Sequence, residues 1–129
     1  MTRDADELSF ELSVHPRGFW LSVILQVAGS DDLQLVIDTG SPVSSLSEGV
    51  LSALLADGLL TPTGESYAAS PIYRLSRLSV EGQAFPDTDV HRGNRATLLR
   101  IDGVLGLDFL YKFGRISFET DKMRLTLTP

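Results

Sequence analysis

An apolar segment that ends in an acidic turn places the strongest constraint on this chain. Residues 33–46 read LQLVIDTGSPVSSL, so a short run of β-prone residues leads directly into Asp38-Thr39-Gly40-Ser41. A carboxylate that a buried strand carries out of water must be hydrogen-bonded, paired with a cation or able to share a proton, because an isolated buried charge is very unfavourable. Asp38 therefore needs either a structural or a chemical explanation.

Composition and charge exclude several classes of protein. A chain of 129 residues with 43% hydrophobic residues suits one folded domain, residues 1–129, with a sizeable core. A net charge of −6 argues against a nucleic-acid partner, and the absence of cysteine excludes disulfides and thiolate metal sites. The N-terminal sequence MTRDADELSF contains no signal-like segment, and no run of about 18 apolar residues occurs. We therefore expect a cytoplasmic protein or a soluble domain excised from a longer protein.

Alternating and apolar runs predict an all-β chain with about nine short strands. Leu8–Val14 alternates apolar and polar residues, as a half-buried strand does. The other predicted strands are Phe19–Ala28, Leu33–Ile37, Leu75–Val80, Gln83–Val90, Ala96–Ile101, Arg115–Phe118 and Met123–Leu127, with further β-compatible residues in Glu65–Arg77. Leu59–Gly64 is expected to be a connector, and His91–Asn94 a polar loop.

One main helix is predicted after the acidic turn. Apolar residues recur there at helical spacing, namely Val50, Leu51, Leu54 and Leu55. This spacing predicts a helix over about 47–57 that packs on the core, with Gly58 at its C-terminal end. Ser45 and Glu48 have the S-x-x-E spacing of a capping box at its start.

A second glycine-containing signature follows late in the chain. Val104-Leu105-Gly106 is followed by Leu107-Asp108-Phe109-Leu110. Leu107–Phe113 is predicted to form one or two helical turns closed by Gly114, with Asp108 as the helix cap. A three-residue Asp-Thr-Gly pattern is weak by itself. The preceding apolar strand, the following helix and the second signature make the combination specific.

At these residues the chain resembles a known family. Residues 35–41, LVIDTGS, resemble the catalytic turn of aspartic proteases, and Val104-Leu105-Gly106 with Asp108-Phe109-Leu110 is similar to the strand and short helix that close the active-site loop in the retropepsin-like branch. The resemblance implies a single-domain retropepsin-like acid protease fold, a closed β-barrel-like half with a short helical turn after Gly106.

The resemblance also implies a homodimer. Pepsin-like enzymes are similar to two such halves in one chain, with two catalytic aspartates, whereas this chain has one Asp-Thr-Gly and is too short for two lobes. Each subunit would supply its own Asp38 across a twofold axis, through an isologous interface. Arg115–Thr128, with Leu8–Val14, is the candidate for the dimer sheet, because terminal strands in this family often pair across the twofold.

The implied activity is that of an aspartic endopeptidase acting on a polypeptide. Aspartic proteases are the standard example of two carboxylates that share one proton, and the ionised one activates a water as general base. No metal or organic cofactor is implied, and water is the nucleophile. By the same resemblance, Thr39 would hydrogen-bond across the dimer, Gly40 would let backbone approach the carboxylates, and Ser41 would donate to Asp38.

The resemblance places a substrate-covering flap over Tyr67–Ile72. Its tip would be formed by the small residues Ala68, Ala69 and Ser70. Pro71 stiffens this segment and removes a hydrogen-bond donor, so an ordinary surface hairpin is the alternative interpretation.

Three alternatives stay open from the sequence. A non-catalytic dimerisation or peptide-binding module could retain the fold, and a different hydrolase could use Asp38 and Asp108 as an acid–base pair within one subunit. Asp87, Asp89 and His91 alternate, so a strand would place them on one face that a metal could use. A solvated polar face is the preferred interpretation of these three residues, and we expect no metal.

Overall fold

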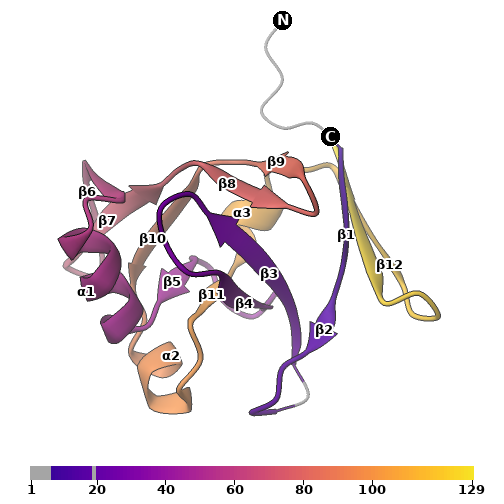
Figure 1. The fold of residues 1–129 in the computed structure, drawn as a ribbon, viewed down its shortest axis with the longest axis horizontal. Helices are drawn as coiled ribbons and strands as arrows, with labels where there is room; N and C mark the ends of the chain where they lie inside the picture. The colour runs from indigo at the N-terminus through magenta and orange to yellow at the C-terminus, as the bar shows by residue number, and fades with distance from the viewer. Residues whose placement is uncertain (1–6, 19) are drawn as a thin grey trace, which may run out of the picture.

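Strands dominate the computed structural model, which describes residues 7–18 and 20–129 (Figure 1). The strands are β1 (Leu8–Glu11), β2 (Ser13–Val14), β3 (Leu21–Val27), β4 (Leu33–Ile37), β5 (Ser45–Leu46), β6 (Leu60–Tyr67), β7 (Ser70–Leu75), β8 (Leu78–Val80), β9 (Gln83–Phe85), β10 (Thr88–Arg92), β11 (Gly103–Leu105), β12 (Arg115–Glu119) and β13 (Arg124–Thr128). The helices are α1 (Glu48–Ala56), α2 (Asn94–Leu99) and α3 (Leu107–Leu110). The predicted all-β class is confirmed.

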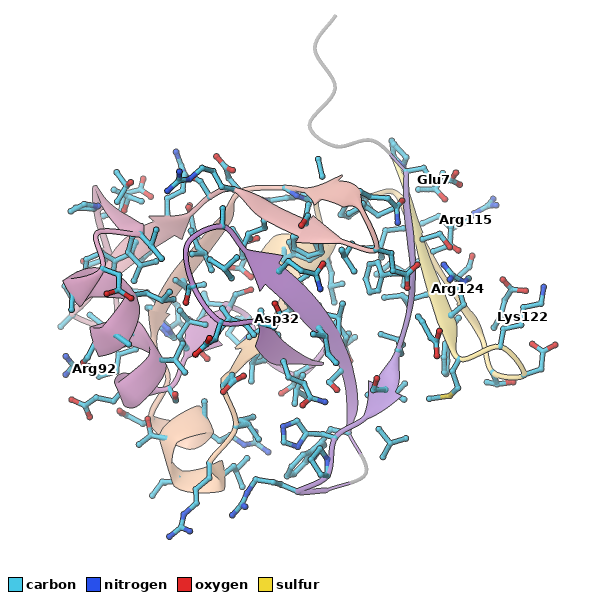
Figure 2. All side chains as sticks on the ribbon, in the orientation of Figure 1. Glu7, Asp32, Arg92, Arg115, Lys122 and Arg124 are labelled. Atoms are coloured by element: carbon cyan, nitrogen blue, oxygen red, sulfur yellow. The ribbon has the colours of Figure 1, made fainter. Side chains whose placement is uncertain are left out.

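The strands form two sheets. The larger has the order β6-β7-β10-β5-β11-β4-β3-β8-β9, with β2 paired to β3. Within it, β11 lies between β4 and β5, parallel to β4 and antiparallel to β5. The smaller sheet has the order β1-β13-β12, and Figure 2 labels Arg115, Lys122 and Arg124 along it. Because β4 and β11 run side by side, Asp38 and Gly106 both follow strands at the same end of the sheet.

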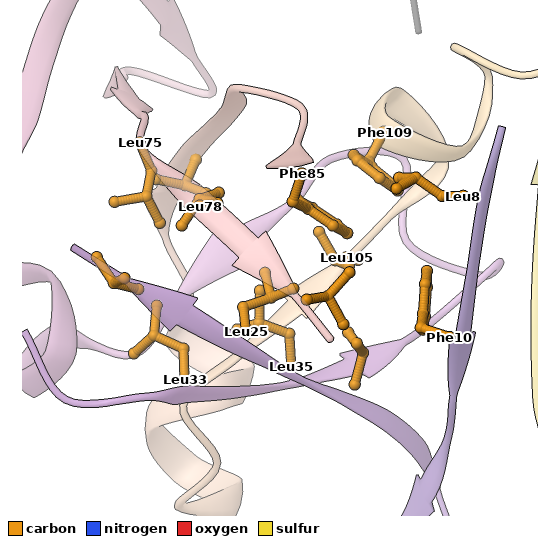
Figure 3. Packing of buried hydrophobic residues seen from close by; sticks show 14 of the residues in the cluster. Leu8, Phe10, Leu25, Leu33, Leu35, Leu75, Leu78, Phe85, Leu105 and Phe109 are labelled. Atoms are coloured by element: carbon orange, nitrogen blue, oxygen red, sulfur yellow. The ribbon is translucent and has the colours of Figure 1, made fainter. Parts of the chain in front are cut away.

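One apolar core joins the two sheets (Figure 3). It combines Leu8 and Phe10 of β1 with Leu25, Leu35 and Leu105 of the larger sheet and Leu125 and Leu127 of β13. The rings of Phe85 and Phe109 are stacked, 4.9 Å apart and 4° from parallel, and Phe10 lies 6.3 Å from Phe85. The stacked rings fix α3 against β9 of the larger sheet, and Phe85 in turn contacts Phe10 of the small sheet, so the second glycine signature is anchored to the core.

Helix α1 confirms the predicted main helix but not its predicted cap. Ser47, not Ser45, is the N-cap, and its Oγ accepts a hydrogen bond of 3.4 Å from the backbone N–H of Val50. Ser45 lies in the two-residue strand β5 and is buried. Both serines precede the helical run. A strand of two residues is too short to show an alternating pattern, so the sequence does not reveal that Ser45 belongs to a strand and that Ser47 caps the helix. Gly58 follows the helix with φ +71°, as predicted for a glycine after the C-cap.

The predicted strand Ala96–Ile101 is wrong, because most of this segment lies in α2. Ala96 and Ile101 are buried, whereas Leu98 is 82% exposed, so the apolar residues do not alternate as a strand requires. Thr97 Oγ1 donates 2.9 Å to the carbonyl of Gly93 and accepts 2.9 Å from the N–H of Glu48. These bonds, one to α1 and one to the N-cap of α2, favour a helical turn that the local sequence does not specify.

Other element boundaries differ from the predicted ones. Leu59–Gly64 is not a connector, since most of it belongs to β6. Gln83–Val90 is interrupted at Pro86, which has no N–H for a sheet hydrogen bond, and so forms β9 and the start of β10. The predicted polar loop His91–Asn94 is also wrong at its start, because β10 continues through His91 and Arg92.

Two predicted strands are divided by local bends. Leu8–Val14 divides at Leu12, after which the chain leaves the small sheet and pairs with β3. Leu75–Val80 divides at Arg77, whose φ of 58° is incompatible with an extended strand. Phe19, the first residue of another predicted strand, lies outside the described residues. Across the described ranges, 7–18 and 20–129, no helix is long and apolar enough to cross a membrane.

Candidate active site

Asp38 stands directly after β4, where backbone hydrogen bonds fix its position. Its N–H donates 3.0 Å to the carbonyl of Leu105 in β11. Its Oδ1 accepts 2.8 Å from the N–H of Gly40, and its carbonyl accepts 3.2 Å from the N–H of Ser41. No ion pair to Asp38 is formed among the residues that the structure describes. The half-buried carboxylate is therefore oriented by backbone, without a cation to neutralise it.

The rest of the Asp38 turn is partly open to solvent. Thr39 and Gly40 are exposed, and a Cβ at Gly40 would lie 3.1 Å from Asp38 Oδ1. Ser41 Oγ donates 2.7 Å to the carbonyl of Val43. The expected donation from Ser41 to Asp38 is therefore wrong for this chain, because the hydroxyl closes the turn onto its own backbone instead.

The second glycine signature packs directly against this turn. Val104 and Leu105 are buried in β11, and the N–H of Leu107 donates 2.8 Å to the carbonyl of Ser41. A Cβ at Gly106 would lie 2.6 Å from the carbonyl oxygens of both Ser41 and Val43. Only glycine allows the two turns to approach this closely.

Ser44 and Asp108 join the two turns through side chains. The buried Ser44 Oγ donates 2.7 Å to Asp108 Oδ1 and accepts 3.0 Å from the N–H of Gly106. The N–H of Ser44 donates 3.1 Å to Asp108 Oδ2. The predicted cap role of Asp108 is wrong, because Gly106 is the N-cap of α3 and no side chain caps it. Asp108 lies within the first turn, where it accepts 2.8 Å from the N–H of Phe109, and it holds a distant turn in place. These structural bonds occupy Asp108, which argues against a catalytic pair of Asp38 and Asp108.

The segment expected to be a flap is a β-hairpin. Strands β6 and β7 pair antiparallel up to Tyr67 and Ser70, so Ala68 and Ala69 form a two-residue turn and Ser70 begins β7. Ala68 has φ 47° and Ala69 has φ 66°, which are the signs of a type I′ turn. Alanine is strained in this conformation, which glycine and asparagine adopt more readily.

A cavity of about 220 Å³ lies between this hairpin and the segment that follows the Asp38 turn. Its lining includes Val43, Ser44, Tyr67, Ile72, Val90 and His91. The rings of Tyr67 and His91 lie 5.3 Å apart, and His91 Nδ1 is buried without a hydrogen-bond partner within the described chain. The sequence analysis did not predict Tyr67 or His91 as site residues. The only pattern that involved His91 was its alternation with Asp87 and Asp89, which indicated either a metal site or a solvated face.

A polar cluster lies next to this cavity, beside Asp89, which also lines it. Asp89 Oδ1 accepts 3.0 Å from Arg74 Nε, which raises the pKa of Arg74, whereas Asp87 precedes the strand. Lys112 Nζ donates 2.6 Å to the carbonyl of Asp87, and burial lowers the pKa of Lys112. In the described part of the chain, no group of three or more His, Asp or Glu side chains is placed to hold a metal.

The arrangement of these turns and sheets matches a solved structure. The crystal structure of a retropepsin-like aspartic protease from Rickettsia conorii superposes with a TM-score of 0.61, at 20% sequence identity, over 98% of this chain and 96% of that chain. The fold is retropepsin-like. No protein-family model matches the chain, and no curated protein matches it in sequence. The predicted single-domain retropepsin-like fold, with its curled half-barrel sheet, is thus confirmed at the level of structure.

Proposed function

We propose that this chain is one subunit of a homodimeric aspartic endopeptidase, with Asp38 of each subunit forming the catalytic pair. The observation that carries the proposal is the retropepsin-like fold together with a half-buried Asp38 whose carboxylate is oriented by the Gly40 N–H and paired with no cation in the described chain. Such a carboxylate remains available to meet a second copy of itself. The exposed Thr39 is likewise available for a hydrogen bond across the twofold.

The proposed mechanism needs two carboxylates and a water. Two adjacent Asp38 side chains cannot both ionise, so they share one proton. The ionised carboxylate removes a proton from water as it attacks the peptide carbonyl, and the protonated one donates a hydrogen bond to the carbonyl oxygen. A proton then passes to the leaving nitrogen as the C–N bond breaks. The pair acts as a unit, so neither Asp38 alone is a catalyst.

A peptide substrate would lie extended beneath the β6–β7 hairpin. Extended peptides pair through backbone groups, and pockets for alternate side chains give sequence preference. The cavity beside Val43, Tyr67 and His91 has the size and the largely apolar lining of such a pocket. In this proposal Ala68, Ala69 and Ser70 form the flap tip, while Val104, Leu105 and Gly106 position the Asp38 turn.

Asp38→Asn tests the function directly. Wild type and variant are incubated with a quenched fluorogenic peptide library over acidic to neutral pH, and Asp32→Asn, an exposed aspartate outside the site, is the matched control. We expect Asp38→Asn to lower the cleavage rate by about 10²-fold or more, while Asp32→Asn stays near wild type. Cleavage that persists in purified Asp38→Asn would overturn the proposal. Peptide binding without cleavage by wild type at every pH would instead support a non-catalytic binding module.

A further inference from the structure

The cavity beside the Asp38 turn has the size of one aromatic side chain. Its volume is about 220 Å³. A cavity of about 150 Å³ inside a protein can hold benzene, so the additional space suits a ring that carries one small substituent. Val43 and Ser44 line this cavity and follow the Asp38 turn directly in the sequence. A peptide that lies across Asp38 can therefore place a neighbouring side chain in the cavity.

Most of the lining is suited to a ring. Val43, Ile72 and Val90 supply apolar contacts, and Tyr67 also borders the cavity. The ring of Tyr67 is inclined by 58° to the ring of His91. Aromatic rings prefer such tilted contacts to a face-to-face stack, so a further ring can pack favourably beside this pair.

His91 Nδ1 is the polar group of this cavity that lacks a partner. Within residues 7–18 and 20–129, it is the one buried side-chain nitrogen or oxygen without a hydrogen bond. Neighbouring polar side chains are already bonded, Ser44 Oγ to Asp108 and Asp89 to Arg74. A buried polar atom without a partner is unfavourable. A ligand that supplies the missing hydrogen bond therefore gains more than its apolar contacts alone would give.

A hydroxyl suits this nitrogen in either form of the neutral imidazole. Nδ1 accepts a hydrogen bond when the proton is on Nε2, and it donates one when it carries the proton itself. A phenol hydroxyl can donate or accept, so it pairs with both forms. Because Nδ1 is buried and the Tyr67 ring lies 5.3 Å from the imidazole, we expect the Tyr67 ring to turn outward as the hydroxyl enters. Tyr67 is 40% exposed and stands next to the hairpin turn, so its ring has space to move.

The carboxylates at the cavity disfavour a charged ligand. Asp89 and Asp108 both border it. A carboxylate or phosphate that entered would meet these like charges in a largely apolar space. A cationic side chain would lose its water there without finding a free carboxylate, since both already have partners. The cavity therefore favours a neutral ring with a single hydrogen-bonding group.

We infer that this cavity binds a tyrosine side chain of the peptide substrate and that His91 selects its hydroxyl. The inference rests on the proposed peptidase function and deepens it by naming a substrate class, peptides with an unmodified tyrosine near the scissile bond. His91 is then a specificity-determining residue, because it bonds a group remote from the bond that breaks. Tyrosine is preferred to phenylalanine, which leaves Nδ1 unpaired, and to phosphotyrosine, which brings an anion into the cavity.

Fragment binding tests the cavity without any cleavage. p-Cresol carries the side chain of tyrosine and toluene that of phenylalanine, and long-range ¹H–¹⁵N spectra report on the imidazole nitrogens. We expect p-cresol to shift the Nδ1 signal of His91 and to bind about fivefold more tightly than toluene. His15, the other histidine, should be unchanged. p-Cresol that binds no better than toluene, or that leaves the His91 signal in place, would overturn the inference.

Cleavage of matched peptides tests the selection by His91. Fluorogenic peptide mixtures carry tyrosine, phenylalanine or phosphotyrosine at one fixed position, and the positions on both sides of the scissile bond are fixed in turn. At one position we expect kcat/KM for tyrosine to exceed that for phenylalanine by about tenfold or more, with phosphotyrosine the poorest of the three. His91→Leu should bring the ratio of tyrosine to phenylalanine near one, and His91→Asn, whose amide can replace Nδ1, should retain part of it. Arg92→Leu, at the exposed next residue of β10, is the matched control and should keep the wild-type ratio.

The two proposals fail in distinguishable ways. Asp38-dependent cleavage with equal rates for tyrosine and phenylalanine at every position, or with a tyrosine preference that persists in His91→Leu, would retain the peptidase and exclude this role of His91. Binding of p-cresol at His91 without cleavage of any peptide would support the cavity and count against the peptidase.

Discussion

Ser44 Oγ donates a 2.7 Å hydrogen bond to Asp108 Oδ1 across 64 residues of sequence. The same hydroxyl accepts from the N–H of Gly106, so one buried oxygen binds both the turn after Asp38 and the turn that begins α3. This hydroxyl helps to fix how the second glycine signature packs behind the candidate catalytic turn.

Ser44→Ala should destabilise the fold by about 1–3 kcal/mol, because it leaves the N–H of Gly106 without a buried partner and removes one of the two hydrogen bonds to Asp108 Oδ1. Urea denaturation followed by circular dichroism measures the loss. Ser52→Ala, at an exposed position in α1, is the matched control and should be neutral or slightly stabilising. A Ser44→Ala variant as stable as Ser52→Ala would show that the bond between the turns contributes little.

Gly106→Ala should destabilise more, because its Cβ would meet the carbonyl oxygens of Ser41 and Val43 at 2.6 Å. Backbone on both sides cannot move away easily, so we expect a loss of about 2–4 kcal/mol by the same measurement, with peptidase activity lost as the Asp38 turn shifts. Gly49→Ala is the control, since nothing lies within 4 Å of its Cβ and it stands inside α1. It should gain about 0.5–1 kcal/mol from higher helix propensity. Equal effects at the two glycines would contradict this account of the packing.

The sequence was most informative where a feature depends on neighbouring residues. The strand Leu33–Ile37, the turn at Asp38 and the terminal hairpin each carry a local pattern, and the structure places all three as predicted. The insertion of β11 between β4 and β5 depends on pairing between distant segments, and β5 has only two residues. Alternation and turn signals contain no information about such pairing.

The same limit explains the errors in the site. Asp108 was predicted as a local helix cap, and its bonds to Ser44 could not be foreseen because they join residues far apart in sequence. Ser41 was assigned a family role, but its hydroxyl bonds to Val43 instead. The contact between Tyr67 and His91 depends on how the hairpin lies over β10, which the sequence does not specify.

Ala69→Gly should stabilise the hairpin. Ala69 has φ 66°, a left-handed conformation that disfavours a Cβ and that glycine adopts without strain. We expect a gain of about 0.5–1 kcal/mol by urea denaturation, with slower hydrogen exchange at the amides that flank the turn. Ala84→Gly, at an exposed position in β9, should instead lose about 0.5–1 kcal/mol. A loss at both positions would mean that the turn is not of type I′.

Glu81→Gln should remove an acid-sensitive contribution to stability. Glu81 Oε2 accepts 2.7 Å from the N–H of Glu11, and its other carboxylate oxygen pairs with Arg124 at 3.2 Å. The hydrogen bond from the backbone of Glu11 is the larger of the two effects, and together with Arg124 it holds the pKa of Glu81 below its ordinary 4.5. A lowered folded-state pKa means that the unfolded chain binds the proton more readily. The advantage of wild type over Glu81→Gln is therefore full above pH 4.5, decreases as the pH falls through the lowered folded-state pKa, and vanishes below it. Urea midpoints from neutral pH to about 3 measure this difference. Glu7→Gln, at an exposed position, is the matched control for the loss of one carboxylate. A difference between wild type and Glu81→Gln that stays the same at every pH would contradict the role of the Glu81 carboxylate.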